Sequence, residues 1–89
     1  MPTVNLVIRG KVQGVFYRSS AREKAEALGV TGWVRNTEEG EVELTASGSE
    51  ELLGKLIDWC HKGPAKAVVT EVKVRHLPEI QFQGFRIVR

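Results

Sequence analysis

Near the start of the chain every second residue is apolar: Val4, Leu6 and Ile8. A period of two is typical of a β-strand with one buried face. Further along, the apolar residues follow the spacing of one helical face: Ala21, Ala25 and Leu28. The pattern therefore predicts a strand followed by a helix. Ser19 or Ser20 is placed to cap the start of that helix, and Gly29 to cap its end.

The middle of the chain predicts a hairpin and a second helix. "VTGWVRN" (30–36) and "EVELTAS" (41–47) have the composition and alternation of strands, and "TEEG" between them is a turn signal. After Gly48, Ser49 is a candidate N-cap for a helix with an apolar stripe. That stripe consists of Leu52, Leu53, Leu56, Ile57 and Cys60. "KGP" (62–64) ends the helix, and two further strands follow around residues 68–74 and 85–89.

This order, β-α-β-β-α-β-β, predicts an α+β fold with a ferredoxin-like β-α-β-β-α-β core. We expect an antiparallel sheet of four or five strands with two helices on one face, and residues 1–89 as a single domain. A helix joins the first two strands, so they run in the same direction. With the third strand between them they lie roughly 10 Å apart. Arg18 and Asn36, at the matching ends, would face one small pocket.

Composition narrows the function classes. The chain is 42% hydrophobic and 27% charged, with a net charge of +2, which indicates a globular protein without the basic patch of a nucleic-acid binder. The single cysteine, Cys60, excludes an internal disulfide and suits a reducing compartment. The first residues, "MPTVNLVIRG", lack the long apolar stretch of a signal peptide, and nothing approaches membrane-spanning length. We therefore expect a cytoplasmic protein, monomeric and without a membrane or nucleic-acid partner.

The connection between the first strand and the first helix, "RGKVQGVFYRSS" (9–20), has an unusual composition for a turn. Gly10 and Gly14 allow the backbone to approach a ligand closely. The amides of a loop that enters a helix can converge on an anion, and Arg18 adds a planar guanidinium suited to phosphate. Glycines and a solvated arginine are also ordinary in such loops, so the spacing alone leaves a purely structural role open.

Two motifs in this chain resemble the acylphosphatase family. "GKVQGVFYR" (10–18) matches the pattern Gly-x-Val-Gln-Gly-Val followed by aromatic residues and an arginine. "GWVRNTEEGEVELTASG" (32–48) matches a second pattern, Gly-aromatic-Val-x-Asn-x-x-x-Gly-x-Val followed by five residues and a glycine. Both stand in the expected order and separation, so the resemblance covers essentially the whole chain. Tyr17 is the one variation, where phenylalanine is common.

The resemblance implies hydrolysis of a small-molecule acyl phosphate to a carboxylate and inorganic phosphate, without a metal or other cofactor. It implies that Arg18 and nearby backbone amides hold the phosphate, and that Asn36 positions the attacking water. The amides are those of Gln13, Gly14, Val15, Phe16, Tyr17 and Arg18. A carboxylate leaving group, whose conjugate acid has a pKa near 4, departs without a general acid. The lack of a catalytic histidine or carboxylate in these motifs is consistent with that reaction.

Other residues are expected to be structural. Cys60 completes an apolar stripe, and neighbouring helical residues point about 100° apart, so Cys60 and His61 do not suggest a catalytic pair. His76 has no partners for a metal site. Phe16 and Tyr17 could either pin the loop to the core or form a wall of the pocket, and pinning suits a preorganised site better.

Two other functions fit the fold. One is a non-catalytic ferredoxin-like module that binds phosphate, another anion or single-stranded RNA. The strands lack the aromatic RNA-binding signature, and the charge is low for such a role. The other is the acylphosphatase-like domain that begins hydrogenase-maturation carbamoyltransferases. Those proteins are much longer and carry cysteine-rich zinc segments that this chain does not have.

Overall fold

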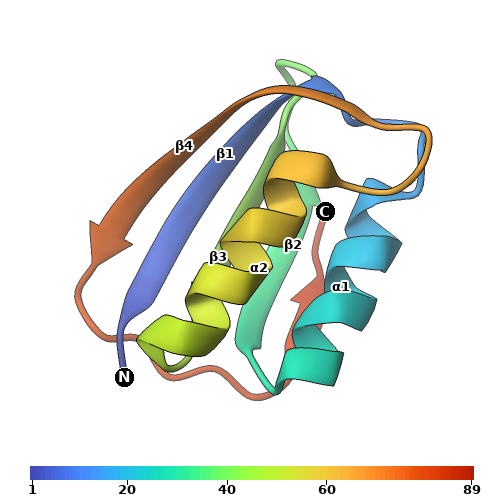
Figure 1. The fold of residues 1–89 in the computed structure, drawn as a ribbon. Coiled ribbons are helices and arrows are strands. Elements are labelled where there is room, and N and C mark those ends of the chain that lie inside the picture. The colour runs from blue at the N-terminus through green and yellow to red at the C-terminus, as the bar shows by residue number, and fades with distance from the viewer.

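The computed structural model describes all 89 residues and has the predicted two layers, a five-stranded sheet and two helices (Figure 1). The sheet order is β4-β1-β3-β2-β5. The strands are β1 (Thr3–Lys11), β2 (Thr31–Asn36), β3 (Val42–Ser47), β4 (Val68–Leu77) and β5 (Phe85–Ile87). The helices, α1 (Tyr17–Leu28) and α2 (Glu50–Lys62), lie side by side over one face of the sheet (Figure 1). None of the helices has the length and apolar character needed to cross a membrane.

The sheet is mixed, although an antiparallel one was predicted. β1, β2, β3 and β4 pair antiparallel, but β5 joins the outer edge of β2 in parallel, with Gly32 opposite Phe85 and Val34 opposite Ile87. The long segment after β4 runs back past the sheet before β5 begins, and this reversal makes the last strand parallel (Figure 1). The chain therefore ends beside the C-terminal end of β2.

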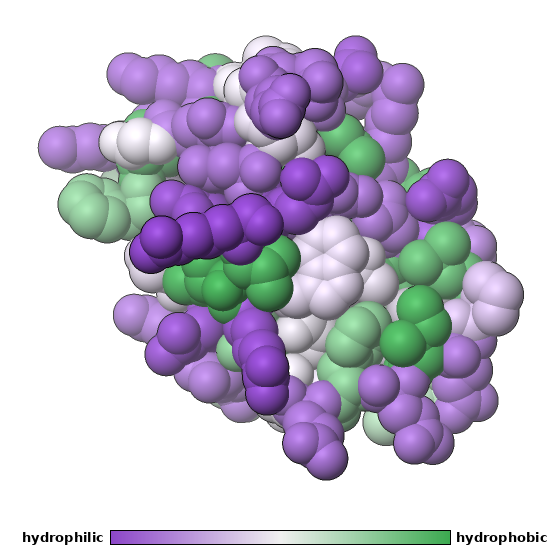
Figure 2. All heavy atoms as spheres, turned by 180° about the vertical axis from the view of Figure 1, so that it is seen from behind, coloured by the Kyte–Doolittle hydropathy of each residue, from purple (hydrophilic) through white to green (hydrophobic).

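The core lies between the sheet and the helices, as the alternation predicts. Val4, Leu6 and Ile8 of β1 are buried there, together with Val42, Leu44 and Ala46 of β3. The helices add Ala21, Ala25, Leu53, Leu56 and Cys60. The other face carries mostly hydrophilic side chains, with small apolar groups between them (Figure 2). At one end of that face the segment before β5 covers Thr3 and Ser47, which bond to the backbone of Ile80.

The helix ends follow the sequence signals with one exception. Ser49 Oγ accepts from the amide of Leu52, and Gly29 closes α1 in the left-handed conformation. The predicted cap of α1 by Ser19 or Ser20 is wrong, because the helix begins earlier, at Tyr17. The residue before it, Phe16, is the N-cap and has no capping side-chain bond. This end of α1 therefore keeps free backbone donors.

Candidate active site

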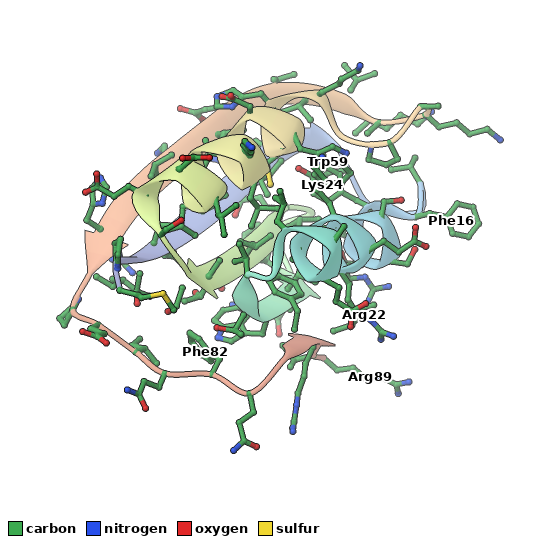
Figure 3. All side chains as sticks on the ribbon, turned by 60° about the horizontal axis from the view of Figure 1, so that its bottom comes forward. Phe16, Arg22, Lys24, Trp59, Phe82 and Arg89 are labelled. Atoms are coloured by element: carbon green, nitrogen blue, oxygen red, sulfur yellow. The ribbon has the colours of Figure 1, made fainter.

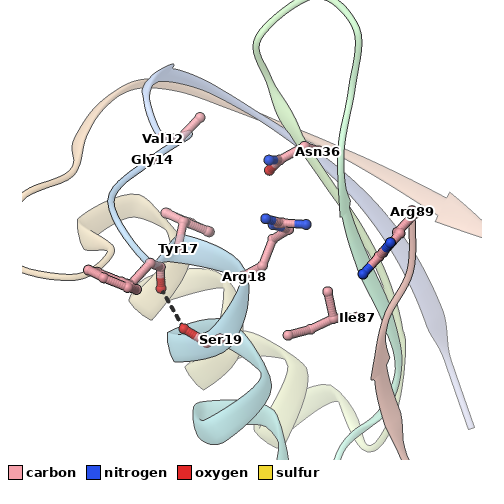
Figure 4. Close-up of a pocket in the computed structure, with 9 residues that line it drawn as sticks. Val12, Gly14, Tyr17, Arg18, Ser19, Asn36, Ile87 and Arg89 are labelled. Atoms are coloured by element: carbon pink, nitrogen blue, oxygen red, sulfur yellow. Dashed lines mark hydrogen bonds between the residues drawn. The ribbon is translucent and has the colours of Figure 1, made fainter.

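A pocket of about 510 Å³ opens where the chain leaves β1 and enters α1 (Figure 4). One wall is the anion loop, a name used here for residues 13–18. Asn36, the last residue of β2, forms the opposite wall, and the end of the chain closes the third side with Ile87 and Arg89. In Figure 4 the side chains of Arg18 and Asn36 point toward each other across the pocket. The predicted convergence of these two residues is thus present in the structure.

The sheet order explains this convergence. β1 and β2 run in the same direction on either side of β3, and Ile8 and Asn36 both lie opposite Val42. The last residue of β2 and the loop after β1 therefore emerge at the same edge of the sheet. Hydrogen bonding along three strands fixes the distance between the ends of β1 and β2, and the loop that follows β1 lies outside this ladder.

The backbone of the anion loop offers a set of unused donors. No hydrogen bond in the structure has a backbone amide of residues 13–18 as its donor. The first turn of α1 carries no acidic residue that would compete for these amides. Amides at a helix N-terminus, reinforced by the helix dipole, favour a bound anion such as phosphate.

Phe16 holds this backbone in an uncommon shape. It is the only residue other than glycine with a positive φ, at 65°, and its side chain is 78% exposed. Left-handed backbone at a bulky residue costs on the order of 1 kcal/mol, and such residues gather at functional sites. A left-handed residue next to a right-handed one turns successive amides toward one concave point. Phe16 points away from the body of the molecule (Figure 3), so its backbone carries this role.

Tyr17 supplies the anchor for the loop. Its ring is 1% exposed, its hydroxyl donates to the carbonyl of Cys60 at 2.7 Å, and the ring lies 5.4 Å from that of Trp59. Burial raises the pKa of the Tyr17 phenol far above its ordinary value, so the hydroxyl stays protonated and donating. Tyr17 therefore pins the loop to α2, as expected. The same expectation for Phe16 is wrong, because its side chain is exposed and points away from the core.

Arg18 brings an uncommitted positive charge into the pocket. Its side chain is half-buried and takes part in no ion pair, whereas Arg9 and Arg35 on the open face pair with glutamates. Arg89 lines the same pocket and is also unpaired. No acidic side chain lines the pocket, so an anion entering it meets attraction from both guanidinium groups.

Asn36 contributes a hydrogen-bond acceptor to the pocket, opposite the donors of the loop and Arg18. Its Oδ1 is buried and has no hydrogen-bond partner, the one side-chain oxygen or nitrogen in the structure for which this holds. An unpaired buried acceptor costs roughly 1–3 kcal/mol and is rare in folded proteins. It is suited to receive a hydrogen bond from a water molecule or ligand in the pocket. Because it faces Arg18, a water held there would lie beside a phosphoryl group bound to the loop.

The sequence reasoning missed three contributors to the site. Ile87 and Arg89 reach it only because β5 is parallel, and no local pattern signals that direction. Gln13 was expected to contribute its backbone, but its side chain bonds to the carbonyls of Thr37 and Glu41 in the turn between β2 and β3. The position of Gln13 in the first motif was the available signal. Gly10 was expected to approach a ligand, and it lies instead against β4.

Cys60, His61 and His76, which the sequence analysis expected to have no catalytic or metal-binding role, lie outside the pocket. Cys60 is fully buried, whereas His61 is exposed and its Nδ1 lies 3.0 Å from the carbonyl of Ile57. His76 is exposed on β4. No three or more His, Cys, Asp or Glu side chains are grouped so that they could hold a metal ion.

Comparison with known proteins agrees with the motifs. The family model described as Acylphosphatase matches residues 4–87. A protein named Acylphosphatase from Marinobacter nauticus is 52% identical over 83 residues, covering 92% of this chain and 90% of the relative. The solved structure of an acylphosphatase from Coxiella burnetii has a TM-score of 0.94 at 39% identity and covers 98% of this chain and 92% of that one. The acylphosphatase from Bacillus subtilis has a TM-score of 0.96 at 29% identity, with both chains covered in full.

Proposed function

The chain belongs to the acylphosphatase family, whose members act on small acyl phosphates, and we propose that Arg18, Asn36 and the amides of the anion loop carry out its reaction. The observation that carries this assignment is the unpaired, buried Oδ1 of Asn36 opposite the free guanidinium of Arg18. An acceptor for water and a set of donors for phosphate thus share one pocket.

In the proposed mechanism the loop holds the phosphoryl group. Its amides and Arg18 donate to the three non-bridging phosphoryl oxygens, on which charge is spread in the transition state. These donors are fixed by the backbone before the substrate arrives. Binding therefore requires little reorganisation of the loop backbone.

Asn36 places the nucleophile. A water molecule donates one hydrogen bond to Oδ1, which directs an oxygen lone pair at phosphorus, in line with the bond to the acyl oxygen. The water oxygen forms a new bond to phosphorus, and the phosphorus–acyl oxygen bond breaks with its electron pair leaving on the carboxylate. A carboxamide is too weak a base to take the proton, so a phosphoryl oxygen accepts it. No protein group has to change its charge during this step.

The pocket also has room for the acyl part of the substrate. About 510 Å³ exceeds the size of a phosphoryl group, and Ile87 supplies apolar surface in the same pocket. We propose that the chain works as a cytoplasmic monomer without a nucleic-acid partner, a proposal supported by its low net charge and single cysteine. The alternative, an anion-binding module without catalysis, requires the same pocket and differs only in the absence of turnover.

The test is phosphate release from benzoyl phosphate, a simple acyl phosphate, by the wild type, Arg18→Ala and Asn36→Ala, with and without a chelator. We expect metal-independent turnover by the wild type and a loss of about 100-fold or more in each variant, by analogy with removing one transition-state donor. Arg22→Ala is the matched control, because Arg22 lies one turn further along α1 and pairs with Glu26 on the surface (Figure 3). Wild-type rates in Arg18→Ala or Asn36→Ala would refute the site. A folded wild type without turnover would leave the binding module as the function.

A further inference from the structure

We propose that Gln13 is a positioning residue, whose side chain ties the anion loop to the turn after Asn36 and so sets the distance between phosphate and attacking water. This inference rests on the proposed roles of Arg18 and Asn36. It concerns the carboxamide of Gln13, which is distinct from the backbone amide of the same residue.

The evidence is a pair of hydrogen bonds made by one nitrogen. Nε2 of Gln13 donates to the carbonyl of Thr37 at 2.9 Å and to the carbonyl of Glu41 at 2.9 Å. A carboxamide nitrogen has two N–H donors, and both are used here. The reversed orientation would set the side-chain oxygen against two carbonyl oxygens. The two contacts therefore hold the Gln13 side chain in a single orientation.

The turn that Gln13 grips is itself closed. The amide of Thr37 donates to the carbonyl of Glu41 at 2.8 Å, and the amide of Glu41 donates back to Thr37 Oγ1 at 3.1 Å. The carbonyl of Glu41 thus accepts from both Thr37 and Gln13. A loop tied to this turn is tied to a rigid unit.

The position of this unit in the chain gives the link its function. Thr37 directly follows Asn36, and Oδ1 of Asn36 has no hydrogen-bond partner that would hold it in place. The place of Oδ1 therefore depends on the backbone at the end of β2. β1 and β2 are separated by β3, so no strand pairing connects the anion loop directly to Asn36. The Gln13 side chain makes that connection.

The consequence is geometric. The loop fixes where phosphorus lies, and the end of β2 fixes where the water lies. In-line attack needs both within a few tenths of an ångström, and a misplacement of about 1 Å lowers a rate by about 100-fold. Loss of the Gln13 link should leave the anion loop and the end of β2 intact but change the distance between them. The effect should fall on kcat, with little change in the affinity for phosphate.

The experiment compares Gln13→Ala and Gln13→Glu with the wild type in turnover of benzoyl phosphate, competitive inhibition by inorganic phosphate, and urea unfolding. We expect Gln13→Ala to lower kcat about 10-fold or more while the inhibition constant for phosphate changes by less than about 3-fold. Gln13→Glu should lose at least as much, because its carboxylate faces two carbonyl oxygens. Gln83→Ala, an exposed glutamine on the segment before β5, is the control and should behave as the wild type.

A double mutant separates positioning from general damage. In the Asn36→Ala background no water is held by Oδ1, so adding Gln13→Ala should change kcat by less than about 3-fold. Three results would overturn the proposal: wild-type kcat in Gln13→Ala, a phosphate affinity that falls as much as kcat, or losses that multiply in the double mutant. Wild-type activity in Asn36→Ala alone would refute the site assignment instead, and the single-mutant data distinguish that outcome.

Discussion

At the scale of single residues, the pocket is set apart by polar groups without partners. Elsewhere in the molecule buried polar side chains are paired: Asn5, for example, donates to Glu43 and Thr45, each at 3.0 Å. In the pocket Asn36 Oδ1 has no partner, and Arg18 has no counter-ion. Neither the unpaired Asn36 Oδ1 nor the unpaired Arg18 helps the chain to fold, because unpaired buried groups reduce stability. The pocket therefore retains polar groups that are available to a ligand.

This difference predicts opposite effects of one substitution at two asparagines. Asn36→Leu removes an unpaired acceptor at similar volume, so the free energy of unfolding should rise by about 1 kcal/mol while turnover is lost. Asn5→Leu removes the donor that serves Glu43 Oε2 and Thr45 Oγ1, and it should lower the free energy of unfolding by about 1–3 kcal/mol. Urea unfolding followed by circular dichroism measures both values. A clear destabilisation by Asn36→Leu would show that its carboxamide is satisfied in solution.

At the scale of elements, the motif glycines divide into two kinds. Gly10 lies in β1 at an irregularity in its pairing with β4, with φ at 130°. A Cβ on Gly10 would come 2.0 Å from the carbonyl oxygen of Val68. Gly14 lies in the anion loop with φ at 75°, and a Cβ there would meet nothing within 4 Å. Gly10 therefore serves the sheet, and Gly14 serves the pocket.

The pair Gly10→Ala and Gly14→Ala should accordingly separate stability from activity. Gly10→Ala forces two strands apart and should lower the free energy of unfolding by about 3 kcal/mol or more. Gly14→Ala adds only backbone strain, so it should lower the free energy of unfolding by only about 1 kcal/mol. It should still reduce turnover, because Gly14 lies in the anion loop. Thermal unfolding and benzoyl phosphate hydrolysis test the two variants in parallel. Equal destabilisation by both would contradict the division.

Element order and the meeting of Arg18 with Asn36 followed from periodicity and the rule that a crossover helix joins parallel strands. Both predictions depend only on the local pattern of apolar residues and on the order of the elements, which can be read from the sequence. The left-handed backbone of Phe16, the parallel direction of β5 and the Gln13 bonds did not follow. The last two depend on contacts between segments far apart in the chain, at 24 and 28 residues for Gln13. Local propensity carries no record of such contacts.

At the scale of the whole molecule, the two helices are joined by the only tyrosine and the only cysteine in the chain. The Tyr17 hydroxyl of α1 bonds to the carbonyl of Cys60 in α2. Burial raises the pKa of the Cys60 thiol to about 12, partly offset by hydrogen bonding with Tyr17, and burial likewise raises the pKa of Tyr17. Both groups therefore stay protonated in the folded state at pH values where the unfolded chain ionises.

The sign of this linkage predicts alkaline unfolding. Well below pH 9, where both groups are protonated in the folded and the unfolded state, their contribution is constant. As pH rises above 9.0 for Cys60 and 10.0 for Tyr17, the unfolded chain loses protons first, and stability falls by about 1.4 kcal/mol per pH unit for each group. Urea unfolding at pH 8 to 11 measures the slope. Cys60→Ala should flatten it between pH 9 and 10, and identical slopes in the two proteins would contradict the assignment.

If the preformed anion loop holds phosphate as proposed, it should also slow the release of the product. In the proposed mechanism its amides contact the phosphoryl oxygens of the substrate, and the inorganic phosphate released at the end of the reaction presents similar oxygens to the same donors. Binding energy that is equal for substrate, transition state and product does not speed the chemical step, and it slows the release of phosphate. An acylphosphatase with this architecture turns over fastest when its hold on phosphate is weak at rest and strengthens only while the bond to the acyl oxygen is breaking.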